Sequence, residues 1–211
     1  LGLINDPEMP NLAENLINSG ILFKARLVFT LLATGSLFLF FFRPRDGFFY
    51  IQIILLLGQT FLMPTIRELG DDSRQLPLRN ISKLILNVRE KDETLAMIGI
   101  RKPSLHFYSR QIVFYEPNNK EGFINLNERL NFDRRKNYED KPNYEYKSLL
   151  VVIDKYSSSE EHWSKINHQK LGEYGIYNLW RIQKSDLNRY SEYLRDNGFK
   201  SDWRDRRVEK F

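Results

Sequence analysis

The side chains best suited to chemistry lie in one stretch, "GIRKPSLHFYSRQIVFYEP", residues 99–117. An apolar run stops there at a glycine, and two cations, a proline and a serine follow before a second apolar run begins. Cations beside the first turn of a helix favour anions, because the backbone N–H groups of that turn have no partner within the helix. The stretch therefore predicts a site for a phosphate or a sugar hydroxyl. Its candidate residues are Arg101, Lys102, Ser104, Tyr108 and Arg110.

The geometry expected of this stretch is compatible with such a site but does not require it. Pro103 suits a turn, and Ser104 is a candidate helix cap that would leave the preceding cations beside the helix start. Tyr108 and Arg110 follow within two turns and can reach the same side. From composition alone, a capped helix with a structural role and solvated cations is a simpler interpretation than an anion-binding site.

Other catalytic patterns are missing from the sequence. It has no GxSxG, P-loop, HExxH or GxGxxG motif and no cysteine, which excludes disulfides, cysteine zinc sites and thiol nucleophiles. His162 and His168 fall in an expected polar helix region, and we expect both at the surface rather than on a metal. The paired carboxylates are interpreted as solvated runs: Asp71–Asp72, Glu139–Asp140 and Glu160–Glu161.

The elements that must position the candidate site alternate between helices and strands. Apolar residues at helical spacing predict an amphipathic helix of about 14 residues from Gln75. The further predicted strands are 95–100, 111–116, 148–154 and 175–184. The further predicted helices are 104–110, 125–136, the stretch "SSSEEHWSKI" with serine caps, and 185–198 with Ser185 as N-cap and Gly198 at the C′ position. This alternation predicts a small α/β sandwich.

Two apolar blocks, residues 21–42 and about 47–66, precede these elements. Each is close to the roughly 20 apolar residues that a membrane-spanning helix needs. The short link "RPRD" between them predicts an antiparallel hairpin, because a helix rarely continues past the residue before Pro44. The expected fold class is therefore an α-helical membrane hairpin followed by a small α/β domain. The alternative is a helical hairpin buried in a soluble core.

The expected domains are a juxtamembrane segment, 1–20, the two transmembrane helices, 21–66, and a soluble α/β domain, 67–211. The first is either a short interfacial helix ended by Gly20 or an ordinary connector. Arg43 and Arg45 in the tight link favour its cytoplasmic placement, which would put the α/β domain outside the cell membrane. Lys24 and Arg67 flank the opposite ends, so this bias is slight.

The charge of the chain lies in its C-terminal part. The formal net charge is +5, with 32 Lys and Arg against 27 Asp and Glu, and the cations of residues 1–66 balance their anions. A basic domain tethered to a bilayer is drawn to anionic headgroups and lipid phosphates. The alternative is a soluble surface with a slight cation excess. Nucleic acid is not an expected partner, since no helix-turn-helix, zinc-finger or RNP pattern occurs.

Five short stretches occur in a recognisable order. They are "DPEMPNLAENL" before the first apolar block, then "KPSLHFYSR", "LLVVID", "EEHWSKI" and "GIYNLWRI". Together with the hairpin, this order resembles the C-terminal region of bacterial membrane glycosyltransferases, and the cyanobacterial members look most similar. Their family includes the dolichyl-phosphate-mannose–protein mannosyltransferases and the aminoarabinose transferase of lipid A. Each stretch by itself is weakly specific, and the order carries the resemblance.

The resemblance implies transfer of a sugar from a polyprenyl-phosphate donor to a lipid or protein acceptor at the outer face of the inner membrane. Such enzymes are similar in carrying an acidic catalytic residue in their first external loop. Asp6 and Glu8 lie in the wrong region for that role, so no catalytic residue is assigned here. The chain starts with Leu1 inside the apolar "LGLI", and we expect it to be the C-terminal piece of a longer protein.

The resemblance also implies partners and a location for the α/β domain. The expected partners are the lipid-linked donor, membrane lipid and upstream membrane helices of the same protein. The domain is expected on the periplasmic side, covering the active-site cavity, with the five candidate residues near the donor phosphate or the acceptor. Any divalent metal is expected in the part that precedes Leu1, and none in this chain. The alternatives are a non-enzymatic membrane-anchored module that binds a partner or headgroups, and a nucleic-acid-binding domain.

Overall fold

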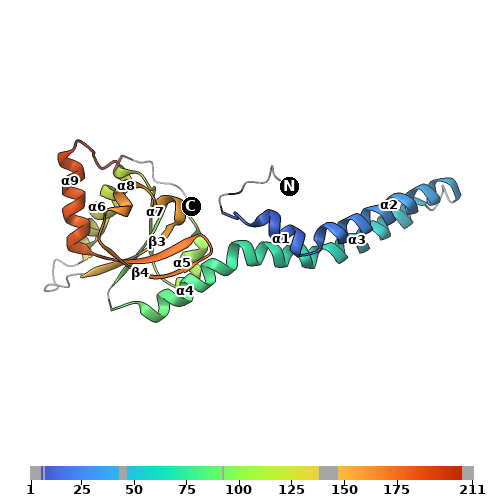
Figure 1. Ribbon diagram of the computed structural model, residues 1–211, viewed down its shortest axis with the longest axis horizontal. Coiled ribbons are helices and arrows are strands. Elements are labelled where there is room, and N and C mark those ends of the chain that lie inside the picture. Colours follow the sequence, from blue (N-terminus) through green and yellow to red (C-terminus); the bar gives the residue numbers. More distant parts are fainter. Residues whose placement is uncertain (1–5, 7, 43–46, 92, 138–146, 206–211) are drawn as a thin grey trace. The chain divides into compact units, whose positions relative to one another are not determined.

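A computed structural model describes residues 6, 8–42, 47–91, 93–137 and 147–205, and it divides the chain into two compact units, Leu1–Leu76 and Pro77–Phe211. Figure 1 shows the elements in chain order. The first unit contains the helices α1 (Leu12–Asn18), α2 (Ile21–Phe42) and α3 (Gly47–Gly70) and a π-helical turn, Asp71–Gln75. The second unit contains five strands and the remaining helices, so the predicted fold class of a helical hairpin plus a small α/β domain is confirmed.

Helices α2 and α3 pack against each other as an antiparallel pair. Gly58 lets them approach closely, since a Cβ atom at this position would lie 2.7 Å from Val28 Cγ1. At one end of the pair, Lys24 Nζ donates a hydrogen bond of 2.8 Å to Thr65 Oγ1. Small residues at such contacts are typical of helices that associate in a membrane.

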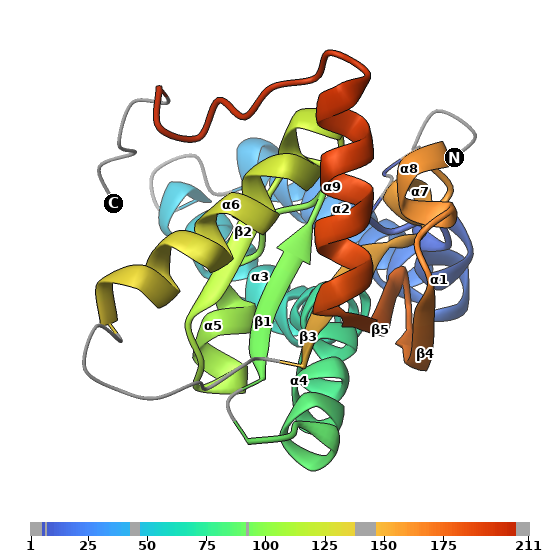
Figure 2. The ribbon, with the colours of Figure 1, turned by 90° about the vertical axis from the view of Figure 1, so that its left-hand side faces the viewer.

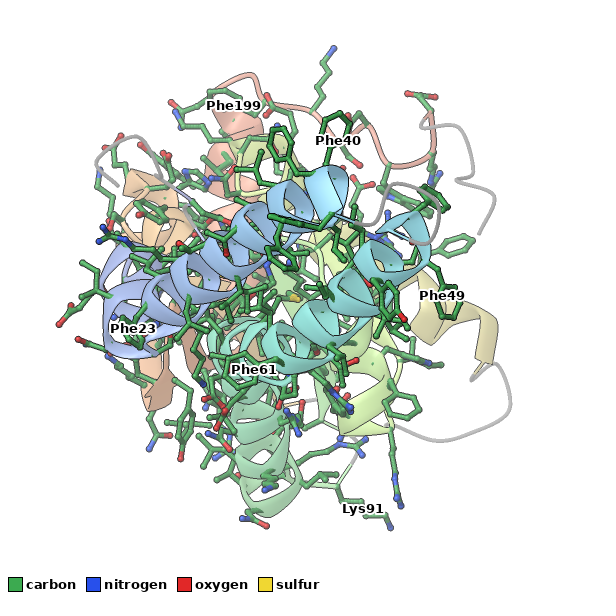
Figure 3. All side chains as sticks on the ribbon, turned by 90° about the vertical axis from the view of Figure 1, so that its right-hand side faces the viewer. Phe23, Phe40, Phe49, Phe61, Lys91 and Phe199 are labelled. Atoms are coloured by element: carbon green, nitrogen blue, oxygen red, sulfur yellow. The ribbon has the colours of Figure 1, made fainter. Side chains whose placement is uncertain are left out.

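The apolar side chains of this helix pair are mostly exposed. Phe23, Phe40 and Phe49 are 72%, 70% and 66% exposed, and Figure 3 shows them on the two helices. Ile21–Phe42 and the helical run Gly47–Val88 are both long and apolar enough to cross a membrane, and only 6% of each apolar window is buried. That low burial argues against a hairpin buried in a soluble core, because large exposed apolar surfaces mark membrane or protein contacts.

The second unit is built on a five-stranded mixed sheet with the order β2-β1-β3-β5-β4. The strands are β1 (Thr94–Ile98), β2 (Val113–Glu116), β3 (Ser148–Asp154), β4 (His168–Tyr174) and β5 (Tyr177–Gln183). β1 pairs in parallel with β2 and β3, whereas β5 pairs antiparallel with β3 and β4. The helix α5 (Pro103–Ser109) connects β1 to β2, and α6 (Lys120–Asn137) begins the crossover from β2 to β3.

Helices cover both faces of this sheet (Figure 2). α4 (Leu76–Val88) and α5 pack on one face through side chains such as Ile81 and Leu105, which meet Leu95 and Met97 of β1. α6 and α9 (Lys184–Asp196) pack on the other face, where the sheet contributes Ala96, Ile98 and alternate residues of β3 and β5. β3 is buried along its whole length, as a continuous apolar strand between two helical layers must be.

A buried ion pair ties α4 to the sheet. The carboxylate of Glu93, which is 3% exposed, accepts hydrogen bonds from Arg181 Nε at 2.8 Å and Ser148 Oγ at 2.7 Å. Arg181 also donates to the Val88 carbonyl at the end of α4. Burial raises the pKa of Glu93, but the hydrogen bonds of Arg181, the backbone and Ser148 outweigh it and hold the pKa below its ordinary value.

Several local predictions are corrected by the structure. "SSSEEHWSKI" does not form one serine-capped helix but two short ones, α7 (Lys155–Ser158), capped by the Asp154 side chain, and α8 (Glu161–Ser164). β4 replaces the expected polar helix around His168, and His162 is buried, not exposed.

The two predicted ends of α9 have different outcomes. Ser185 is not the N-cap of α9, since Gln183 holds that position. The prediction that Gly198 holds the C′ position of α9 is confirmed. Its φ is 90°, and the Phe199 N–H donates a hydrogen bond to the Leu194 carbonyl in the last turn of the helix.

Candidate functional site at the α5 corner

The corner begins with Gly99, which directly follows β1. Its φ is 83°, and a Cβ atom there would lie 2.2 Å from Ser157 Oγ and 2.3 Å from Asp154 Oδ2. Both features require glycine, because L side chains rarely adopt this conformation and the space is filled. The Gly99 N–H donates to the carbonyl of Glu116, which ties the corner to the end of β2.

Helix α5 follows, with Lys102 as its N-cap and Pro103 in its first turn. The prediction that Ser104 caps the helix is wrong: Ser104 lies inside the first turn, and no side-chain cap is present at Lys102. Pro103 explains the difference, since its fixed φ suits the first helical position and makes Lys102, two residues before Ser104, the cap. With seven residues, α5 is a short helix that packs on the core through Leu105.

Arg101 and Lys102 are held at the start of α5 by Tyr115 on β2. The Arg101 guanidinium carbon lies 5.3 Å from the centre of the Tyr115 ring, and the Tyr115 hydroxyl donates to the Lys102 carbonyl at 3.0 Å. Burial raises the pKa of the Tyr115 phenol, and a hydrogen bond at the His106 backbone and the charge of Arg101 only partly oppose this rise. The phenol is therefore a neutral hydrogen-bond donor at physiological pH.

Tyr108 and Arg110 come together at the other end of α5. They line an open cleft of about 620 Å³ with His106, Phe107, Gln111 and Ile112. Arg110 has φ 54° and ends the helix in the left-handed conformation that glycine or asparagine usually supplies. Phe107 and Ile112 are 76% and 75% exposed, so the cleft joins a cation to exposed apolar side chains. The structure thus brings Tyr108 and Arg110 into one cleft, and Arg101, Lys102 and Ser104 do not line it.

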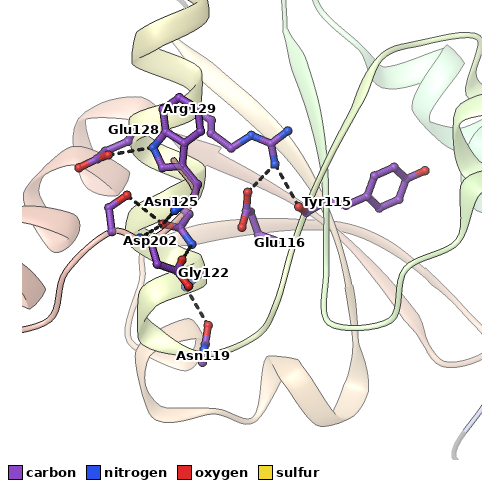
Figure 4. Close-up of polar contacts among 10 residues, drawn as sticks. Tyr115, Glu116, Asn119, Gly122, Asn125, Glu128, Arg129 and Asp202 are labelled. Carbon is purple, nitrogen blue, oxygen red and sulfur yellow. Dashed lines mark hydrogen bonds and ion pairs between the residues drawn. The ribbon is translucent and has the colours of Figure 1, made fainter. Parts of the chain in front are cut away.

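The carboxyl ends of the parallel strands, where open α/β sheets commonly bind ligands, carry two buried acids. Asp154 Oδ1 accepts from the N–H groups of Tyr156 and Ser157, and its Oδ2 accepts from Ser157 Oγ at 2.6 Å. Glu116 pairs with Arg129 at 2.5 Å (Figure 4). Both carboxylates are thus engaged in capping and pairing, which is a structural role.

The sequence reasoning missed this edge of the sheet. An aspartate directly after the apolar run of β3 and three residues before Ser157 was a helix-cap signal that could have been found. The bond between the Trp163 indole N–H and the Asn118 carbonyl, at 3.0 Å, had no such signal, because the two residues are far apart in sequence. Within the described residues, no group of three or more acidic or histidine side chains could hold a metal ion.

Comparison with known proteins identifies the domain that carries this corner. Residues 88–198, more than half of the chain, match the cyanobacterial RgtA-type glycosyltransferase C-terminal domain. The chain belongs to this family. No curated protein and no solved structure matches it. The resemblance to the C-terminal part of a cyanobacterial glycosyltransferase is confirmed, and the RgtA-type match includes all five candidate site residues. The family and the two candidate spans together indicate association with a membrane.

Proposed function

We propose that this chain is the C-terminal region of an integral-membrane glycosyltransferase that takes a sugar from a polyprenyl-phosphate donor to a lipid or protein acceptor. The RgtA-type family and the exposed apolar helix pair support this function. In this proposal the α/β domain faces the periplasm, and the catalytic acid and any divalent metal belong to a part of the enzyme that precedes Leu1. The domain then serves to bind and orient substrate.

The observation that carries the proposal is the mixed character of the cleft beside α5. A polyprenyl phosphate joins an anionic head to an isoprenoid chain. Arg110 offers the head a cation and fixed N–H donors, and the exposed Phe107 and Ile112 offer the chain an apolar surface. Tyr108 lines the same cleft and can hydrogen-bond a phosphate or sugar oxygen. Arg101, Lys102 and Ser104, at the opposite end of α5, are proposed to contact the remainder of the donor or the acceptor.

Replacing Arg110 by glycine tests this role with little effect on the fold. Because φ is 54° at this position, glycine removes the charge and also relieves backbone strain. For the chain in nanodiscs, we expect Arg110→Gly to weaken polyprenyl phosphate binding about tenfold or more, the loss for a charge-assisted hydrogen bond of roughly 1.5–3 kcal/mol. Binding of the uncharged polyprenol should stay unchanged. In the intact enzyme, the same substitution should raise the donor KM.

Arg110→Lys and Arg189→Gln are the matched controls. Lysine keeps the charge and should restore part of the affinity, whereas Arg189, a 79% exposed partner of Asp186 on α9, should not matter. Equal affinity of wild type and Arg110→Gly for polyprenyl phosphate would contradict the proposal. Equal binding of ordinary anionic lipid and polyprenyl phosphate would instead favour the non-enzymatic module that binds headgroups.

A further inference from the structure

A second cleft, of about 820 Å³, lies between α6, α9 and the segment that follows α9. It shares no lining residue with the cleft beside α5. Two phenylalanines, Phe132 and Phe199, line it, and the other lining side chains are all polar or charged. None of these residues was a candidate in the sequence, because they come from three segments that only the fold brings together.

One wall of this cleft is held in place by a buried asparagine (Figure 4). The Asn125 side chain of α6 is fully buried, and its Oδ1 accepts from Ser201 Oγ and from the backbone N–H groups of Asp202 and Trp203. Its Nδ2 donates to Asp202 Oδ1 at 2.6 Å. Glu128, one turn further along α6, accepts from the Trp203 indole at 2.9 Å. The segment after α9 is thus fixed on α6, and the cleft between them is preformed.

The charges in the cleft are balanced, and three of the charged side chains contact other side chains of the described residues. Three acidic and three basic side chains line it. Glu128 forms an ion pair with Arg195 at 2.6 Å, and the Arg204 guanidinium lies over the rings of Phe132 and Trp203 at 5.5 and 5.2 Å. A site for a phosphate would need an excess of unpaired cations. The balance therefore favours a neutral polar ligand over an anion.

Three asparagine amides line the cleft, Asn127, Asn131 and Asn188, and the Asn131 amide donates to Asn127 Oδ1 at 3.5 Å. Among the residues that the structure describes, Asn188 Oδ1 is buried and has no hydrogen-bond partner. Buried amide oxygens are rarely left in that state. Asn188 also lines the cleft, so a ligand hydroxyl is a candidate donor to this oxygen. An amide also donates, so it can satisfy both halves of a hydroxyl group.

We propose that this second cleft binds a neutral glycan, with sugar hydroxyls on the asparagine amides and an apolar sugar face on Phe132 or Phe199. Polar groups that both donate and accept, aromatic surface and no net charge are the complement of an uncharged sugar chain. The choice of a glycan among neutral polar ligands rests on the proposed glycosyltransferase function. The site would hold part of the acceptor, or of the growing product, away from the donor cleft.

The test measures binding of oligosaccharides to the chain, with no sugar donor present and no catalysed reaction. Its outcome is therefore independent of the proposal that the cleft beside α5 binds the donor. The chain is held in a detergent without a sugar headgroup, and saturation-transfer NMR is recorded with cellotetraose, mannotetraose and inorganic phosphate. We expect at least one oligosaccharide to bind and phosphate not to displace it. No signal from either oligosaccharide, or displacement by millimolar phosphate, would overturn the proposal.

Asn188→Leu locates the binding. It replaces the amide by a side chain with the same branching and the same number of heavy atoms, and it takes away a buried oxygen without a partner, so the thermal midpoint should stay the same or rise. Oligosaccharide affinity should fall at least fivefold. Asn178→Leu is the matched control, because Asn178 Oδ1 on β5 is also buried without a partner among the described residues, but Asn178 does not line the cleft. Retained binding in Asn188→Leu, or equal loss in both variants, would refute the assignment.

Discussion

Gly99 carries two separate constraints, one from its backbone and one from its surroundings. Its φ is positive, and the Asp154 and Ser157 side chains occupy the space that a Cβ would need. The sequence showed only that an apolar run ended at a glycine. The clash could not be predicted from it, because Asp154 comes from a different strand, more than fifty residues further along the chain.

Alanine at Gly99 should therefore destabilise the second unit by more than backbone strain alone. We expect a loss of about 3 kcal/mol or more, since the strain of a left-handed residue contributes roughly 1–2 kcal/mol and breaking the Asp154–Ser157 contact adds to it. Thermal unfolding followed by circular dichroism of the chain in detergent measures the loss.

Gly198→Ala is the control, because Gly198 has φ 90° but no atom within 4 Å of a Cβ at that position. It should lose only the strain contribution, about 1–2 kcal/mol. Equal losses at the two glycines would show that the contact between Gly99, Asp154 and Ser157 is not tight in solution.

At the scale of elements, strands with continuous apolar runs could be predicted well. β3 was expected at Ser148–Asp154 and is found there, because burial on both faces gives an uninterrupted apolar sequence. β4 was missed for the opposite reason. Its polar sequence, His168–Tyr174, is that of an edge strand, which among the described strands pairs with β5 alone, and no apolar pattern marks such a strand.

The pairing of Glu93 with Arg181 predicts how stability changes with pH. The folded-state pKa of Glu93 is lowered, so the pair contributes its full stability above the unfolded pKa, near 4.5. This contribution is lost as the pH falls through the lower, folded value. Arg181→Met leaves the carboxylate buried without its cation, and should cost about 3–5 kcal/mol at pH 7.

The cost of Arg181→Met should shrink on acidification, because Glu93 in this variant has a raised pKa and is neutralised at a higher pH than in the wild type. Thermal midpoints of both proteins between pH 7 and pH 3 measure this convergence. Arg189→Met, which removes an exposed pair, should cost less than about 1 kcal/mol at every pH. A constant difference between wild type and Arg181→Met across this range would contradict the assigned role of Glu93.

At the scale of the whole molecule, the two units differ in the surface that they present. The apolar side chains of α2 and α3 are exposed, whereas the second unit buries apolar residues on both faces of its sheet. The sequence predicted this contrast from the uneven distribution of charge. The side of the membrane on which the second unit lies stays a prediction.

The contrast predicts different solubility for the two units. Residues 1–211 should sediment with membranes, resist extraction at alkaline pH and require detergent, because leaving these aromatic side chains in water is unfavourable by about 25 cal/mol per Å². Residues 77–211 alone should stay in solution without detergent. Recovery of the whole chain as a detergent-free monomer would contradict the assignment of α2 and α3 to the membrane.

The strand order also has a consequence for synthesis on the ribosome. β1 pairs with β2 soon after both strands emerge, but its other neighbour, β3, follows only after α6 and residues 138–147 have been translated. At about 5–20 residues per second, the apolar edge of β1 then waits for some seconds without a partner. An unpaired strand edge is a template for aggregation. This interval is the step at which a chaperone would be most useful to the nascent chain.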